Sequence, residues 1–314
     1  MEECDFSNEG IILVLGVTGT GKSYFLNQLK RHSIVLDEDD MRSITVVDTP
    51  GFDDTMRPDG EVLTEITEFL AAQHALGVPL RGVLYFHRIT DDRVAGSSMT
   101  YLRLLESLVG SHALENLILV TTMWNRLRDE DIDQALRREQ ELIDKFWRRM
   151  EDGGSSVAQF DGTADSAYAL VFQLAGKQSV VLEVQKEIVD EDQTMLATAV
   201  GSNLLQQLEE HTETYQIRAA ELESRLDLEL KLEPRNKKTI QQLRNDKADV
   251  DKILRQITSS RDRMMTRPGL PVKERIKRAM EGSGKNLVGS PITILAAVLN
   301  LTLFVVRLGL GGGP

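Results

Sequence analysis

The stretch IILVLGVTGTGKSYFLNQLK, residues 11–30, decides the fold. It begins with the apolar run IILVL, which is typical of a buried strand in a parallel sheet. GVTGTGKS follows at 16–23 and fits the pattern G-x-x-x-x-G-K-[ST], and the residues after it have a helical pattern. Strand, glycine-rich loop and helix in this order predict a loop that holds phosphate groups, a P-loop.

Each residue type in this loop has a role toward phosphate. Glycines let backbone N–H groups curl around an anion, and the N-terminus of the following helix favours negative charge. Lys22 adds a positive charge that reaches the terminal phosphates, and the Ser23 hydroxyl is a ligand for Mg²⁺. The alternative is a chance glycine-rich turn, which the flanking strand and helix disfavour. The expected nucleotide contacts are Gly16, Thr18, Gly19, Thr20, Gly21, Lys22, Ser23 and Tyr24.

A second apolar run, ITVV at 44–47, leads into the turn Asp48-Thr49-Pro50-Gly51. An aspartate at a strand end beside a P-loop holds Mg²⁺, usually through water, and a following glycine gives its N–H to the terminal phosphate. A plain turn is the alternative. We therefore predict Ser23 and Asp48 as metal ligands and Gly51 as a phosphate contact.

Three further apolar runs complete the pattern, GVLYF at 82–86, LILV at 117–120 and VAQF at 157–160. Helical patterns lie between the runs, for example over 61–76 and 131–150. Five strands with crossover helices predict an α/β fold, a doubly wound and mostly parallel sheet, over residues 1–180.

GVTGTGKS, VVDTPGFDD, GVLYFHRITDD and LILVTTMW together resemble the G domain of the septin-like and immunity-associated nucleotide-binding GTPases, over about residues 9–176. The resemblance implies a P-loop G domain that binds GTP or GDP with Mg²⁺ and contacts the base through an N/T-K-x-D loop. It also implies a second loop on the base side in DGTADSA, 161–167, with Ser166 and Ala167 as the expected contacts.

Three departures from that family's pattern qualify the expected chemistry. Only RHSIVLDEDDMRS, 31–43, separates the first helix from ITVV, which is short for a first switch loop with its metal-binding threonine and edge strand. Phe52 follows the DTPG turn where small GTPases carry a glutamine that orients water, so hydrolysis should be slow. Arg57, His87 and Arg88 are candidates to assist hydrolysis in a second subunit across a dimer face. The alternative is that each is a solvated surface residue.

The third departure lies in the loop after LILV. Thr122, Met123, Trp124 and Asn125 align with N/T-K-x-D, so an amide stands where the acid would accept two hydrogen bonds from guanine. Thr122 and Asn125 are the expected contacts, and we predict weakened guanine selectivity in favour of a base with a carbonyl in place of the amine, as in xanthine. Asp129 or Asp131 would supply the missing acid, and the alternative is that Asn125 caps the turn.

Bulk composition limits the class of protein. With 314 residues and 41% hydrophobic side chains the chain buries a full core, and its formal net charge of −12 argues against general nucleic-acid binding. The lone Cys4 excludes an internal disulfide framework. The start MEECDFSNEG is acidic and has no apolar signal region, so a cytoplasmic location is expected.

Residues 181–267 have a different pattern, with apolar side chains at alternating three- and four-residue spacing on both sides of Pro234. Residues 183–233 carry 4 basic and 13 acidic groups, whereas residues 235–267 carry 10 basic and 4 acidic groups. Two amphipathic helices of opposite charge predict a helical hairpin or coiled coil. The alternative is that each helix packs separately, on the G domain or on a second chain.

The last segment, 268–314, combines the basic stretch VKERIKRAMEGSGK with LVGSPITILAAVLNLTLFVV at 287–306, twenty residues without a charge. This length matches a hydrocarbon core, and the upstream basic residues favour a cytosolic flank, so we predict an apolar C-terminal helix that meets a membrane. The alternative is an apolar helix that packs on the core or on a partner.

Two classes of function follow from these motifs. One is an enzyme, a slow Mg²⁺-dependent GTPase that acts as a nucleotide-gated switch. The other is a hydrolysis-deficient GTP-binding scaffold with relaxed base selectivity, which dimerises through its G domain or its coiled coil. An ATP-binding P-loop protein is a more distant third.

Overall fold

The computed structural model of the chain describes residues 9–31, 43–54, 57–91, 96–232, 236–265, 274 and 305–309. The sheet within these residues has six strands in the order β5-β4-β3-β1-β2-β6, of which β6 comprises Val305–Gly309. The first five are parallel, which confirms the predicted doubly wound sheet. Their bounds are β1 Glu9–Gly16, β2 Ser43–Asp48, β3 Leu80–Arg88, β4 Leu117–Thr122 and β5 Ser156–Gln159.

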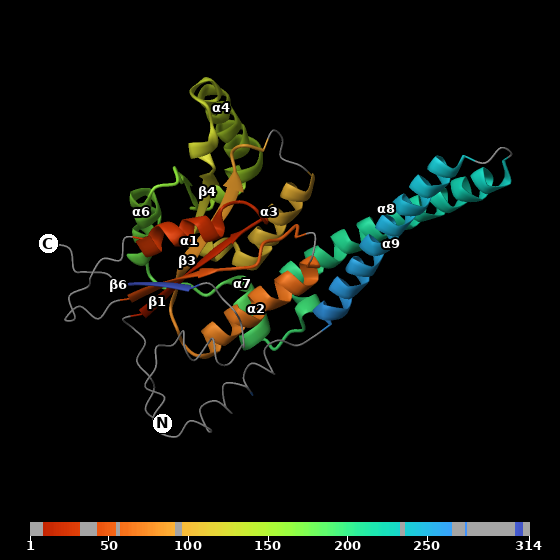
Figure 1. Cartoon of the computed structure of the whole chain (residues 1–314). Helices are drawn as coiled ribbons and strands as arrows, with labels where there is room; N and C mark the ends of the chain where they lie inside the picture. Colours follow the sequence, from red (N-terminus) through yellow and green to blue (C-terminus); the bar gives the residue numbers. More distant parts are fainter. Residues whose placement is uncertain are drawn as a thin grey trace.

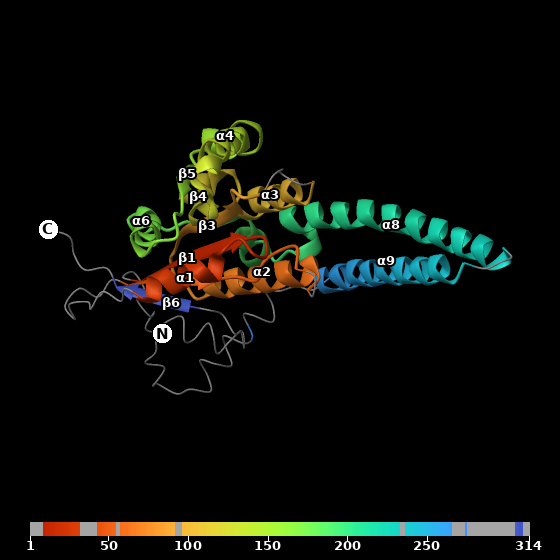
Figure 2. The same ribbon diagram turned by 45° about the horizontal axis from the view of Figure 1, so that its top comes forward.

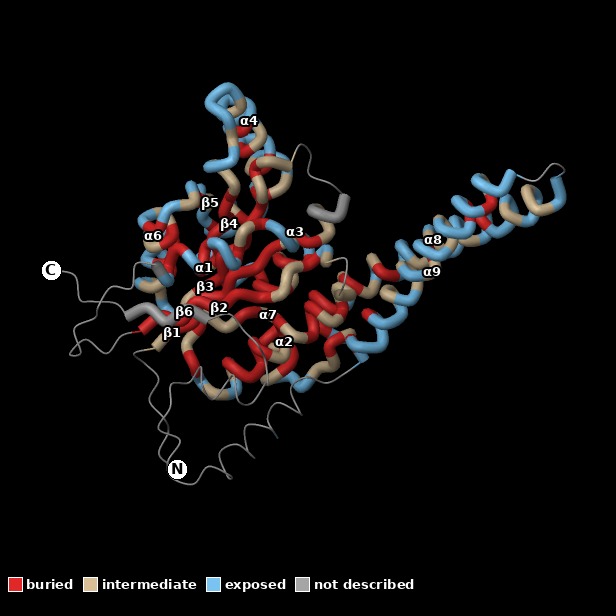
Figure 3. Tube along the Cα trace, in the orientation of Figure 1, coloured by how far each residue is buried: buried red, intermediate tan, exposed pale blue. Residues whose placement is uncertain are grey.

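Helices cover both faces of the sheet, because successive strand residues point to opposite sides (Figure 1). Alternate residues of β1 lie in two separate hydrophobic clusters, and these clusters form the buried centre of the molecule (Figure 3). One cluster packs on α1 (Lys22–Arg31) and α6 (Ala164–Ala175). The other packs on α2 (Asp59–Ala75), α3 (Gly96–Val109), α4 (Ile132–Leu142), α5 (Arg148–Asp152) and α7 (Glu183–Gln185).

Six shorter helical segments join these elements. Four are 3₁₀-helices, Ser111–Asn116, Trp124–Arg126, Asp129–Asp131 and Met195–Ala197, and two are π-helical turns, Ile143–Trp147 and Lys186–Asp190. The segment Trp124–Arg126 directly follows β4 and carries Asn125.

Residues after 198 form a helical hairpin of α8 (Ala199–Lys231) and α9 (Lys237–Met264), which projects from the sheet domain (Figure 2). Asn236 is the N-cap of α9, since its side-chain oxygen accepts hydrogen bonds from the N–H groups of Lys238 and Thr239 at 3.2 and 3.3 Å. Leu222, Leu243 and Val250 pack together in the distal part of the hairpin. They belong to the apolar stripes that the spacing predicts.

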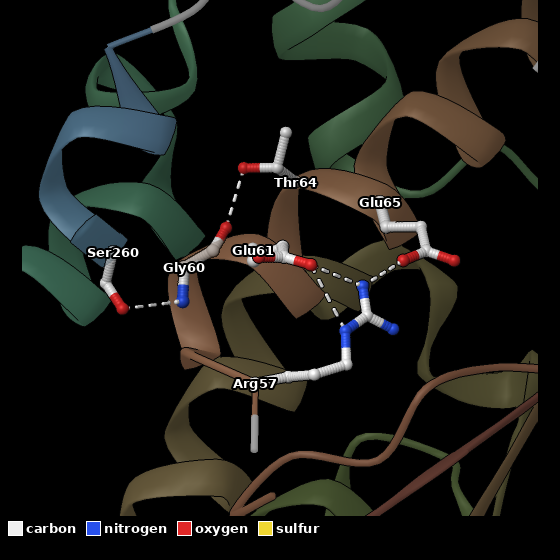
Figure 4. Close-up of polar contacts among 6 residues, drawn as sticks. All are labelled: Arg57, Gly60, Glu61, Thr64, Glu65 and Ser260. Carbon is white, nitrogen blue, oxygen red and sulfur yellow. Dashed lines mark hydrogen bonds and ion pairs between the residues drawn. The ribbon is translucent and has the colours of Figure 1, made fainter. Parts of the chain in front are cut away.

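The base of the hairpin is fixed to the sheet domain. Figure 2 shows α8 beside α3 and α9 in line with α2, and Figure 4 shows the contact between α9 and the first turn of α2. The Gly60 N–H donates to Ser260 Oγ at 3.3 Å. A Cβ on Gly60 would lie 2.4 Å from the Ser260 carbonyl oxygen, so only glycine allows the two backbones to approach this closely.

The C-terminal strand corrects one prediction. Val305 and Val306 end the apolar run that the sequence predicts as a helix, but they lie in β6 (Val305–Gly309), antiparallel to β2 at the sheet edge. Residues 287–304 lie outside the described residues, so the membrane-meeting segment stays a prediction. Within the part of the chain that the structure describes, no helix combines the length and apolar composition that a membrane crossing requires.

Candidate nucleotide-binding site

The P-loop runs from the end of β1 to the start of α1 and depends on its glycines. Gly16, Gly19 and Gly21 have φ angles of 147°, 83° and 93°, a region that side chains with a Cβ rarely adopt. A Cβ on Gly16 would also lie 2.6 Å from the carbonyl oxygen of Phe86 on β3. Thr20 Oγ1 donates to the Val17 carbonyl at 2.9 Å and closes the loop on itself. The loop is therefore wound as a phosphate-binding nest requires.

Lys22 opens α1 and turns its side chain back into the loop. Its Nζ donates to the carbonyl oxygens of Gly16 and Val17 at 3.0 and 3.1 Å. Burial lowers the pKa of Lys22 to about 8, although the carboxylates of Asp48 and Asp54 act in the opposite direction. The amine is thus a buried cation without an adjacent ion-pair partner in the described residues, and an anion in the loop would stabilise its charge.

The pKa of Lys22 predicts how nucleotide affinity depends on pH. If the charged amine binds phosphate as predicted, bound phosphate would hold the proton, so binding above pH 8 would take up a proton. We expect affinity to fall as pH rises from 7.5 to 9.5, by up to about tenfold per pH unit. Calorimetry with a non-hydrolysable GTP analogue, in two buffers of different ionisation heat, measures both the affinity and the proton uptake. A flat affinity with no proton uptake would contradict the role of this amine.

Ser23 and Asp48 meet beside the loop, as their predicted role as metal ligands requires. Ser23 Oγ donates to Asp48 Oδ2 at 2.6 Å. Among the described residues, Asp48 Oδ1 is buried without a hydrogen-bond partner. Burial raises the pKa of Asp48, and the hydrogen bond from Ser23 and the charge of Lys22 act against that rise. A hydroxyl and a buried carboxylate with one unused oxygen fit Mg²⁺, which would supply the missing partner and neutralise phosphate charge.

The DTPG turn is attached to the P-loop through backbone groups. The Thr18 N–H donates to the Phe52 carbonyl at 2.8 Å, and a Cβ on Gly51 would lie 2.6 Å from the Thr18 nitrogen. The Phe52 ring is 5% exposed and stacks on Tyr101 at 5.3 Å between ring centroids. The ring belongs to the core, and it offers no polar group to a water molecule at the phosphates.

A cavity of about 370 Å³ opens between the P-loop and the ends of β4 and β5, and its size is in the range of small-molecule sites. Sequence-predicted residues that line it are Gly19, Thr20, Gly21, Lys22, Ser23, Tyr24, Thr122 and Asn125. Sequence reasoning missed Met123, Arg126, Phe160 and Gly162, which also line it. Ala167 is fully buried in the core. The Ser166 hydroxyl accepts a hydrogen bond from the Asp161 N–H within the loop. Neither of these two predicted contacts in the DGTADSA loop therefore lines this cavity.

Thr122 ties the end of β4 to the P-loop. Its hydroxyl donates to the Thr20 carbonyl at 2.8 Å, and the next residue, Met123, adopts a left-handed φ of 68°. The Met123 side chain thereby reaches Gly21, where a Cβ would lie 3.3 Å from the methionine Cε. Met123 occupies the position of the lysine in N/T-K-x-D and covers one wall of the cavity with an apolar surface.

Asn125 lies against the second loop on this side of the cavity. A Cβ on Gly162 would lie 2.5 Å from Asn125 Nδ2, so the two residues are close neighbours, and the φ of 92° at Gly162 favours glycine. Tyr24 from α1 donates its hydroxyl to the Gly162 carbonyl at 3.2 Å. The amide of Asn125 therefore lies at the cavity wall beside Gly162.

The three candidate helpers lie in different surroundings. Arg57 pairs with Glu61 and Glu65 of α2 (Figure 4). His87 is buried and lies edge-to-face with the Trp147 ring, at 6.1 Å between ring centroids. Burial lowers the pKa of His87. Arg88 pairs with Asp91 at 3.0 Å, and its guanidinium lies 3.2 Å from the position of a Cβ on Gly19. Of the three, Arg88 is the cation that the structure brings to the P-loop.

Fold and site together define a P-loop α/β domain, with a parallel sheet, a wound glycine loop and a serine–aspartate pair at the carboxyl ends of the strands. This confirms the predicted fold class. No family model matches the chain, and no curated protein matches it in sequence.

Several solved G-domain proteins are similar in structure. Toc33 from Arabidopsis thaliana in complex with GDP and Mg²⁺ is 19% identical with a TM-score of 0.44, over 56% of this chain and 88% of that one. SelB from Methanococcus maripaludis, in its apo form, is 15% identical with a TM-score of 0.36, over 56% and 35%. Cdc11 from Saccharomyces cerevisiae is 20% identical with a TM-score of 0.32, over 44% and 63%.

Proposed function

We propose that this protein binds guanine nucleotide with Mg²⁺ and hydrolyses GTP slowly, as a nucleotide-gated switch or assembly module. The observation that carries the proposal is the P-loop itself, wound around a buried lysine and placed beside the Ser23–Asp48 pair. The DTPG turn on the adjoining strand supports a GTPase-type site. Slow turnover follows from Phe52, because a buried ring does not orient water.

The direct test is a binding panel of GTP, ATP and XTP on the full chain, with and without Mg²⁺. The full chain is needed because β6, which pairs with β2, comes from residues 305–309. We expect GTP or XTP to bind more tightly than ATP, and both to weaken when Mg²⁺ is removed. Preference for ATP would favour the ATP-binding alternative, and no binding of any of the three would overturn the proposal.

Asn125→Asp is expected to tighten GTP binding relative to XTP. Aspartate accepts both hydrogen bonds from the guanine ring N–H and amine, whereas the amide accepts one and opposes the other, a mismatch of about 1 to 3 kcal/mol. The GTP to XTP affinity ratio should therefore rise by about 5- to 150-fold. Asp133→Asn is the matched control, since it makes the reverse change at an exposed position on α4 that does not line the cavity. An identical ratio in wild type and Asn125→Asp would show that Asn125 does not touch the base.

The second candidate is a GTP-binding scaffold without significant hydrolysis. A turnover assay at low and high protein concentration separates the two, because a helper residue across a dimer raises the rate only at high concentration. Dimers through the G domain or the helical hairpin, a cytoplasmic location and a membrane contact through the C-terminal segment remain part of the proposal.

A further inference from the structure

A hydrogen-bond network lies behind the base side of the cavity, with Thr121 and Glu139 buried and Gln159 exposed at its edge. Its centre is Glu139 on α4, a carboxylate that is only 9% exposed. Thr121 Oγ1 donates to Glu139 Oε1 at 2.6 Å, and Gln159 Nε2 donates to Glu139 Oε2 at 2.5 Å. The Trp124 indole N–H donates to Thr121 Oγ1 at 3.0 Å. Each carboxylate oxygen thus has its own partner on a different strand.

The two hydrogen-bond partners of Glu139, Thr121 and Gln159, each directly precede one of the two loops on the base side of the cavity. Thr121 and Trp124 flank Thr122 and Met123 at the end of β4, and Asn125 follows directly. Gln159 ends β5 and is followed by Phe160 and Gly162, which line the same cavity. Glu139 lines no part of that cavity, so it acts on bound nucleotide only through these loops.

The alternation of side chains along β4 explains why Thr121 and Thr122 contact different parts of the site. Neighbouring strand residues point to opposite faces, so Thr122 faces the P-loop while Thr121 faces α4. The Thr122 hydroxyl reaches Thr20, and the Thr121 hydroxyl links Trp124 to Glu139. The left-handed turn at Met123 is held between these two anchors.

We propose that Glu139 is a positioning residue for recognition of the nucleotide base, because it ties the loop of Asn125 to the loop of Gly162. The inference rests on the proposed function of this site. Loops that are held in their bound geometry lose less conformational entropy when a ligand binds, so the network raises affinity for the base without touching it. The phosphate half of the site has its own supports in Lys22 and Asp48.

The test compares a ligand with a base to a ligand without one. Affinities of the full chain for a non-hydrolysable GTP analogue and for inorganic tripolyphosphate are measured for wild type, Glu139→Ala and Glu139→Gln. The glutamine keeps an acceptor for Thr121 but turns its NH₂ group toward that of Gln159. We expect both variants to bind the GTP analogue about tenfold more weakly and tripolyphosphate within about twofold of wild type.

The exchange variant Glu139→Gln with Gln159→Glu is the rescue. It retains an acceptor for Thr121 and an amide–carboxylate hydrogen bond between positions 139 and 159, so GTP affinity should return to within about threefold of wild type. Trp124→Phe removes one N–H from the network. It should weaken the affinity for the GTP analogue by about threefold and leave the affinity for tripolyphosphate unchanged. The Trp124→Phe variant still tests the network if a single Glu139 variant does not fold.

The outcomes separate the inference from the proposed function. Parallel loss of GTP and tripolyphosphate affinity, or no rescue by the exchange, would assign Glu139 a purely structural role and overturn the inference. A wild-type protein that binds GTP no better than tripolyphosphate would overturn base recognition itself, and the inference with it.

Discussion

Lys22→Ala should abolish nucleotide binding while the domain stays folded. Lys22 is 7% exposed, and its amine points into the P-loop, where phosphates are expected. Hydrogen bonds to charged groups contribute about 1.5 to 3 kcal/mol each, and a triphosphate accepts more than one from this amine, so a loss of at least about 100-fold is expected.

Folding should survive the change, because burial of the charged amine opposes folding and alanine removes that cost. The lowered pKa of Lys22 is the sign of this cost. Lys30→Ala is the matched control, since Lys30 lies exposed at the far end of the same helix. Calorimetric titration gives the affinity and thermal unfolding checks the fold. Unchanged affinity in a folded Lys22→Ala protein would rule out the P-loop assignment.

Gly60→Ala is expected to loosen the helical hairpin from the sheet domain. Alanine is the better helix former by about 1 kcal/mol, so the local effect alone would stabilise α2. The new Cβ, however, would lie within 2.7 Å of three backbone atoms of Ser260, which do not move aside as a side chain does. Overpacking of this kind costs about 1 to 3 kcal/mol, so the net effect should be destabilising.

Thermal unfolding and amide hydrogen exchange measure this effect, with loss of protection expected in α9. Gly176→Ala is the control, because Gly176 has φ −80° and nothing within 4 Å of the added Cβ. Ser260→Ala removes only the 3.3 Å hydrogen bond and should have a smaller effect. A Gly60→Ala protein as stable as wild type, with α9 fully protected, would contradict the contact.

The sequence predicted the parallel sheet well because its signals are local. Each buried strand is an apolar run, and the P-loop residues are consecutive, so strand, loop and helix are specified together. The serine–aspartate pair was also predictable, since the carboxyl ends of neighbouring parallel strands meet at one edge.

Other features depend on contacts between distant residues, which a single sequence does not specify. The run that ends at Val306 is uniformly apolar, so its pattern does not distinguish a helix from the strand that pairs with β2. Glu139 looks like any helix-surface glutamate in the charged stretch of α4, and only the fold brings it to Thr121 and Gln159. Ser166 and Ala167 do not line the cavity, because the turn of their loop presents Gly162 to it instead.

Because the helical hairpin is long, a small rotation at its base would displace its far end by a larger distance. α8 continues for 23 residues beyond Leu208, its last residue in the core of the sheet domain, which is about 35 Å of rigid helix. α2 begins close to the DTPG turn and touches α9 at Gly60. A rotation of about 5° at this contact would carry the far end of the hairpin through about 3 Å. A pair of dyes, one at the far end of the hairpin and one on α6, would report such a rotation as a change of distance.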